Sequence, residues 1–153
     1  MRDYFRVSDT LAVGRGQPTA EDLAALQAGG FRAVVDLRQP GEPNQVLAPD
    51  QEREVAAQAG LEYRHVPVPA DRLDERLLAG FEQAMADLTG PVFVHCASGK
   101  RSGTLAIMHH VLAEGASGQQ ALQRIEQEGS AYGSAEMRAV VKEFIDRRRS
   151  GGG

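Results

Sequence analysis

The sequence predicts an α/β fold, a three-layer sandwich in which helices flank a mostly parallel central sheet. Short runs of β-branched and aromatic residues alternate with longer segments of helical character along the 153 residues. Strands that are separated by helices pair in parallel, and helices then cover both faces of the sheet. With 42% hydrophobic residues the chain can form one domain, which we place at residues 1–149. Residues 150–153, a Ser and three Gly, are expected to form a flexible tail.

Two short strands and a capped helix are expected to begin the chain. Residues 5–7 and 11–13 are apolar pieces on either side of a polar turn. Thr19 and Asp22 have the spacing of a capping box, so a helix should start there and stop at the following pair of glycines. Residues 31–38 are too apolar for a strand with one exposed face, which places this strand inside the sheet.

The alternation continues to the C-terminus. Residues 50–59 predict a helix and residues 61–68 a strand, whose prolines place it nearer the edge of the sheet. A long amphipathic helix should start at Asp71 or Asp74 and end before the strand at residues 91–94. Three more helices are expected: one ending near residue 114, one spanning 117–128 and one spanning 134–149.

The only cysteine lies at the junction of a strand and a helix. The segment around it reads PVFVHCASGKRSGT, in which an apolar strand ends at Cys96 and a helix follows the Gly, Lys and Arg. Unpaired backbone N–H groups and the positive end of the helix dipole attract an anion at such a position and favour the thiolate form of Cys96. Because a thiolate is a nucleophile, Cys96 is the candidate for covalent catalysis.

Composition argues against several classes of function. The formal net charge of −4 provides no basic field for nucleic acid, and no apolar run approaches the roughly 18–20 residues of a membrane span. A single cysteine cannot form an internal disulfide, which favours a reducing, cytoplasmic location. His109 and His110 lack suitably spaced partners, so no metal site is predicted. The oligomeric state is left open.

The cysteine segment resembles the signature loop of the cysteine-dependent tyrosine and dual-specificity phosphatases, in which His-Cys precedes a Gly-rich turn, an Arg and a Ser or Thr. Other stretches resemble the bacterial phosphatase-like domain called beta-lactamase-hydrolase-like, namely residues 16–19, 22–23, 30–38, 42 and 60–68. The resemblance covers about residues 11–129. It implies a cysteine phosphatase-like fold, no metal or organic cofactor, and a phosphorylated protein or small phosphoester as substrate.

The resemblance also implies roles for the residues of the loop. Cys96 would attack phosphorus and form a cysteinyl-phosphate that water then hydrolyses, and Arg101 would hold two phosphoryl oxygens. Ser102 would assist departure of the sulfur or, alternatively, cap the helix. His95 would orient the loop through backbone hydrogen bonds. Lys100 would screen a polyanion or be an ordinary exposed residue. The substrate-binding N–H groups would belong to the loop between Cys96 and Arg101, which consists of Ala97, Ser98, Gly99 and Lys100.

The leaving group needs a proton, which this superfamily takes from an aspartate in a loop after an upstream strand. Asp71 is in the matching place, twenty-five residues before the cysteine, and Asp74 is the second choice. Either aspartate could instead cap the next helix. Asp36, Arg38 and Glu42 are expected to be structural, with an Arg38–Glu42 ion pair that holds the loop after the strand.

The spacing between Cys96 and Arg101 leaves a second chemistry open. Four residues separate the two, whereas the phosphatase superfamily normally has five. Rhodanese-like sulfurtransferases, whose cysteine carries a persulfide, resemble this shorter spacing, as do members of the bacterial phosphatase-like family with the pattern CxSGxRS. A shorter loop offers fewer N–H donors to a tetrahedral phosphate. Sulfur transfer through a persulfide on Cys96 is therefore kept as the alternative to phosphatase activity.

Overall fold

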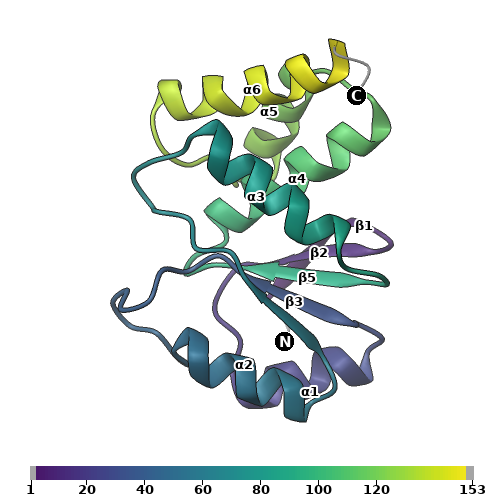
Figure 1. Ribbon diagram of the computed structural model, residues 1–153, viewed down its shortest axis with the longest axis vertical. Helices are drawn as coiled ribbons and strands as arrows, with labels where there is room; N and C mark the ends of the chain where they lie inside the picture. The colour runs from purple at the N-terminus through teal and green to yellow at the C-terminus, as the bar shows by residue number, and fades with distance from the viewer. Residues whose placement is uncertain (1–2, 151–153) are drawn as a thin grey trace.

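The computed structural model describes residues 3–150 and contains a sheet covered by helices on both faces (Figure 1). The strands are β1 (Tyr4–Ser8), β2 (Leu11–Gly14), β3 (Ala33–Asp36), β4 (Glu62–His65) and β5 (Val92–His95). The helices are α1 (Ala20–Ala28), α2 (Pro49–Gln58), α3 (Glu75–Ala86), α4 (Lys100–Glu114), α5 (Gly118–Gln127) and α6 (Ala135–Ser150). Helices α1 and α2 lie below the sheet in Figure 1, and the other four lie above it. The predicted three-layer α/β sandwich is confirmed.

The strand order β1-β2-β5-β3-β4 places β5 in the middle of the sheet. β5 pairs in parallel with β2 and β3, β4 is parallel to β3, and β1 is antiparallel to β2. The carboxyl ends of β3 and β5 therefore meet, with Asp36 opposite His95. Ligands of such sheets bind beyond these ends. The edge position predicted for the strand at residues 61–68 is confirmed, since β4 is an outer strand.

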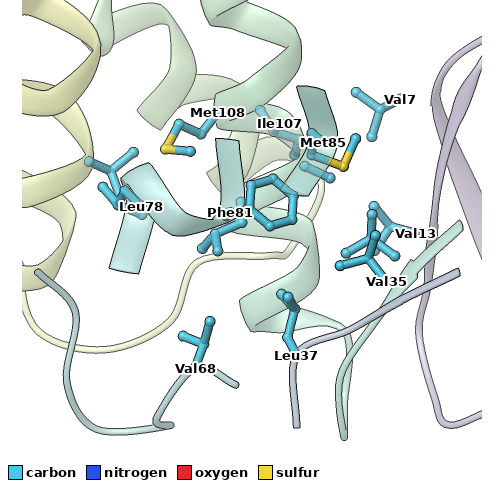
Figure 2. Close-up of a cluster of buried hydrophobic side chains, with 14 of the residues drawn as sticks. Val7, Val13, Val35, Leu37, Val68, Leu78, Phe81, Met85, Ile107 and Met108 are labelled. Carbon is cyan, nitrogen blue, oxygen red and sulfur yellow. The ribbon is translucent and has the colours of Figure 1, made fainter. Parts of the chain in front are cut away.

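Side chains of β2, β3 and β5 alternate between two apolar clusters, one on each face of the sheet. In β3, Val35 packs toward α3 and α4, whereas Val34 packs toward α1 and α2. Figure 2 shows Phe81 of α3 inside the larger cluster, near Ile107 of α4 and Val35. Each such fully buried side chain contributes roughly 1.5–3 kcal/mol. This packing fixes β5 against α4, the two elements that flank the cysteine loop.

Side-chain caps determine where several helices begin. Thr19 and Asp22 form the predicted capping box of α1: the Thr19 N–H donates to the Asp22 carboxylate at 2.8 Å, and the Asp22 N–H donates to the Thr19 hydroxyl at 3.1 Å. Asp74 caps α3 by accepting a hydrogen bond from the Leu77 N–H at 2.9 Å. A cap of this kind stabilises a helix by about 1 kcal/mol.

The last helix, α6, extends slightly further than predicted. Ser150 is its final residue, so this position belongs to the helix and not to the expected tail. The rest of that tail, residues 151–153, lies outside the described residues. Over residues 3–150, every helix is too short or too polar to span a membrane.

Candidate active site

Cys96 directly follows β5 and lies at the start of α4. Its side chain is fully buried. The sulfur accepts a hydrogen bond from the Gly99 N–H at 3.2 Å and lies 3.4 Å from the Ser102 hydroxyl. Both groups belong to the loop and first helical turn that the sequence assigns to anion binding. The sulfur is thus at the positive end of a 15-residue helix, where negative charge is stabilised.

Gly99 gives the cysteine loop its tight shape. Its φ of 90° lies in the left-handed region that favours glycine. A Cβ at this position would lie 3.0 Å from both the Gly14 carbonyl oxygen and the Arg15 Cα, so the end of β2 packs directly on the loop. The bond from the Gly103 N–H to the Gly99 carbonyl, 2.9 Å long, closes the first turn of α4. Backbone N–H groups ahead of that bond have no partner inside a helix: that of Gly99 donates to the Cys96 sulfur, and the others can bind an anion.

The remaining side chains of the loop differ in exposure. Ser98 and Lys100 are exposed, and Ala97 is half-buried. Lys100 forms no ion pair with the residues that the structure describes, which leaves its charge at the rim of the site. Ser102 is fully buried and lies inside the first turn of α4, whose N-cap is Gly99. The alternative that Ser102 caps this helix is therefore wrong.

Arg101 points inward, beside Cys96, and is only 6% exposed. Its Nη1 donates to the Glu42 carboxylate at 2.7 Å and to the Val68 carbonyl at 2.8 Å, and its Nη2 donates to the second Glu42 oxygen at 2.8 Å. A guanidinium has five N–H groups, so the Nε–H and one Nη2–H are left as a second two-point edge. The hydrogen bond to Glu42 raises the pKa of Arg101, burial opposes this, and the neighbouring Cys96 raises it further. Arg101 is thus held as a cation beside the sulfur, with one guanidinium edge that is not bonded to Glu42 or Val68.

Glu42 belongs to the site, and the ion pair predicted for it is wrong. It does not pair with Arg38; it binds Arg101 through both carboxylate oxygens and accepts from the Gln39 N–H at 2.6 Å. The hydrogen bond from Arg101 is the main reason that the pKa of Glu42 lies below its usual value. Glu42 follows β3, whose carboxyl end adjoins that of β5. A carboxylate in the segment that follows this neighbouring strand is the sequence signal that could have identified Glu42 as a site residue.

A buried polar network lies on the other side of His95 from the cysteine loop. Arg38 binds Asp36 and Glu52, each at 2.9 Å. The second Glu52 oxygen lies 2.6 Å from His95 Nε2, and the Tyr63 hydroxyl donates to Asp36 at 2.7 Å. The predicted backbone bonding of His95 is therefore wrong, because a carboxylate holds its ring. Burial acts to raise the pKa of Asp36, yet the bonds from Arg38 and Tyr63 and the charge of His95 hold it below its usual value.

The same network has the spacing of a metal site, since ligand atoms of Asp36, Glu52 and His95 lie within 4.8 Å of one another. All four carboxylate oxygens nevertheless already accept hydrogen bonds from Arg38, Tyr63 or His95. A metal ion would have to displace the Arg38 guanidinium, whose positive charge would repel it. The network instead anchors His95, and with it the strand end that leads into Cys96.

The two candidate acids occupy different positions in the loop between β4 and α3. Asp74 caps α3, so the capping alternative holds for this residue. Asp71 is exposed, and its carboxylate forms no hydrogen bond or ion pair with residues 3–150. The Val68 carbonyl of the same loop accepts from Arg101, which fastens the loop to the cysteine site. Of the two candidate acids, Asp71 is therefore the one whose carboxylate has no partner among residues 3–150.

Comparison with known families identifies the domain that contains this site. Residues 3–113 match the family model described as "Beta-lactamase hydrolase-like protein, phosphatase-like domain". This chain belongs to that family. The Beta-lactamase hydrolase-like protein of Agrobacterium fabrum is 34% identical over 128 residues, which cover 84% of this chain and 28% of that protein. The phosphatase-like domain thus spans less than a third of the length of this relative, and the resemblance drawn from the sequence is confirmed.

Solved structures of cysteine phosphatases share the fold of this phosphatase-like domain. Tk-PTP in its active form has a TM-score of 0.75 at 20% identity, covering 96% of this chain and 98% of Tk-PTP. TpbA of P. aeruginosa has a TM-score of 0.65 at 28% identity, covering 93% of this chain and 82% of TpbA. TpbA has also been solved in complex with pTyr. The fold is therefore that of the cysteine phosphatases, as the sequence predicts.

Proposed function

We propose that this phosphatase-like domain hydrolyses phosphate monoesters through a cysteinyl-phosphate on Cys96. The observation that carries the proposal is the Arg101 guanidinium, which lies beside the buried sulfur, is held in place by Glu42 and keeps one edge unbonded to Glu42 or Val68. Two parallel N–H groups match two oxygens of a phosphoryl group. The start of α4 supplies further N–H donors and a positive partial charge. Together they offset the repulsion between a phosphate dianion and a thiolate.

The proposed reaction has two steps. The Cys96 thiolate attacks phosphorus, a P–S bond forms, and the P–O bond to the leaving group breaks while Asp71 gives its proton to the leaving oxygen. Water then attacks phosphorus, Asp71 takes the proton from that water, and the P–S bond breaks to return the thiolate and inorganic phosphate. The Ser102 hydroxyl, 3.4 Å from the sulfur, stabilises the departing thiolate by donating a hydrogen bond.

Phosphotyrosine in a protein is the substrate class that we favour. The sulfur is fully buried, so the phosphoryl group must reach well below the rim formed by Ser98 and Lys100. A phenyl ring carries the phosphorus further from a peptide backbone than the side chains of phosphoserine or phosphothreonine do. The likeness to TpbA, which has been solved with pTyr, supports the same choice.

Sulfur transfer is the second candidate because four residues, and not five, separate Cys96 from Arg101. The edge of Arg101 that does not bind Glu42 or Val68 would bind the oxygens of thiosulfate as well as those of phosphate. The geometry of the Arg101 guanidinium does not distinguish a phosphoryl donor from a sulfur donor. Measured activity does.

One preparation should be assayed in parallel for hydrolysis of p-nitrophenyl phosphate and for sulfur transfer from thiosulfate to cyanide. We expect phosphate release without sulfur transfer, and Cys96→Ser should be inactive in both assays. Sulfur transfer without phosphate release would overturn the proposed function.

Asp71→Asn is expected to lower kcat/KM, which reports the first step, for alkyl phosphates by about 10²-fold or more, but for p-nitrophenyl phosphate by less than about tenfold. Nitrophenolate is a good leaving group and needs little help from an acid, whereas an alkoxide needs a proton. Asp74→Asn is the matched control, because asparagine caps a helix about as well as aspartate and should leave both rates unchanged. Equal losses of kcat/KM on the two substrates in Asp71→Asn would assign Asp71 to structure.

A further inference from the structure

Tyr132, in the connection between α5 and α6, carries a polar atom that the proposed reaction does not yet use. Its hydroxyl is shielded from solvent and has no hydrogen-bond partner among the described residues. Among the described residues, His95 Nδ1 is the only other buried side-chain nitrogen or oxygen atom without a hydrogen-bond partner. A buried hydroxyl without a partner costs stability, so its presence calls for an acceptor that the free protein does not provide. Tyr132 also lies beyond residues 3–113, which match the family model.

The connection that carries Tyr132 is packed against the first turn of α4. The Thr104 hydroxyl donates to the Ser130 carbonyl at 2.7 Å. Gly103 has no side chain at the point where Ser130 approaches, and a Cβ there would overlap the Ser130 side chain. Tyr132 and Thr104 line one small apolar cavity together with Leu73, two residues after Asp71. Tyr132 therefore lies close to the start of α4 and to the loop of the proposed acid.

Arg101 and Cys96 both interact electrostatically with the Tyr132 hydroxyl. Burial raises the pKa of Tyr132 to about 12; the positive charge of Arg101 acts to lower it, and Cys96 acts to raise it. The phenol is thus protonated at neutral pH and presents a neutral donor. A donor of this kind is what the cysteine loop lacks, because the loop is one residue shorter than the phosphatase pattern and has one backbone N–H fewer.

We propose that the Tyr132 hydroxyl donates a hydrogen bond to the phosphoryl group bound over Cys96, as a side-chain replacement for the N–H that the short loop does not have. The inference rests on the proposed function, since it assigns a further substrate-binding residue to the same site. The Tyr132 hydroxyl then has a hydrogen-bond acceptor only when an oxyanion is bound over Cys96. Tyr132 would then contribute to binding of the phosphoryl group in the ground state and in the cysteinyl-phosphate.

The test is the affinity of Tyr132→Phe for inorganic phosphate, measured by titration calorimetry on the full chain. Loss of a hydrogen bond to a charged acceptor should weaken phosphate binding about tenfold or more. The free variant should be as stable as the wild type or more stable, because only an unpartnered hydroxyl is removed. Tyr4→Phe is the matched control: its ring packs edge-on against Phe31 and Phe93 on the other face of the sheet, and its phosphate affinity should not change.

Phosphate binding of Tyr132→Phe equal to that of the wild type would overturn this inference and leave the proposed function intact. A marked loss of stability in free Tyr132→Phe, with phosphate affinity unchanged, would likewise show that the hydroxyl is structural. Failure of the wild type itself to bind phosphate would contradict the proposed function, and the inference with it. The wild-type titration thus separates the two failures.

Discussion

Cys96→Ser is expected to lower kcat for p-nitrophenyl phosphate by about 10⁴-fold or more while the fold is retained. Serine is close to cysteine in size and keeps an acceptor for the Gly99 N–H at this fully buried position. Its alcohol has no accessible anionic form near neutral pH, so the in-line attack on phosphorus is lost. The rate and the urea midpoint of one preparation check both halves of this expectation. A variant that retains more than about one per cent of the wild-type rate would exclude covalent catalysis by Cys96.

Arg101→Lys is expected to lower kcat/KM by about 10²–10³-fold although the positive charge is conserved. An ammonium cannot present two parallel N–H groups to a phosphoryl group while also binding Glu42 and the Val68 carbonyl. The loss should appear with aryl and alkyl phosphates alike, since both share the phosphoryl group. A rate within about threefold of the wild type would mean that Arg101 does not contact the substrate.

Glu42→Gln supplies the control that separates positioning from contact. Glu42 acts on the reaction through Arg101, so this variant should lose about tenfold in kcat/KM on its own. In the Arg101→Lys background the same change should have almost no further effect, because the residue that Glu42 positions is already gone. Additive losses in this double-mutant cycle would show that Glu42 acts independently of Arg101.

Local patterns in the sequence predict the elements that carry the site. The apolar strand before Cys96, the glycine after it and the helical segment that follows are neighbours in the chain, and their geometry depends on short-range rules. The cap of α1 at Thr19 and the placement of Arg101 beside the sulfur could likewise be anticipated. The alternation of strands and helices predicts the three-layer α/β fold, and the family resemblance adds that this fold is cysteine phosphatase-like; the structure and the family match confirm both.

Partners that lie far apart in the sequence could not be predicted in the same way. Glu42 meets Arg101 across 59 positions, and Glu52 meets His95 across 43. Both pairings depend on how the segments after β3 fold back toward β5, which periodicity and capping rules do not describe. A nearby pair such as Arg38 and Glu42 looks more plausible in the sequence. Burial decides otherwise, because Arg38 has two buried carboxylates within reach at Asp36 and Glu52.

The chemistry of Cys96 is tested most directly by the intact mass of the protein after acid quenching during turnover of p-nitrophenyl phosphate. We expect a fraction of the wild type to gain about 80 Da as a cysteinyl-phosphate, with no gain in Cys96→Ser. Asp71→Asn should accumulate more of this species, because it lacks the base that activates water in the second step. The account would be contradicted if none of these proteins formed a phosphate adduct and the wild type instead gained about 32 Da after treatment with thiosulfate. A gain of this size that dithiothreitol reverses is the mark of a persulfide.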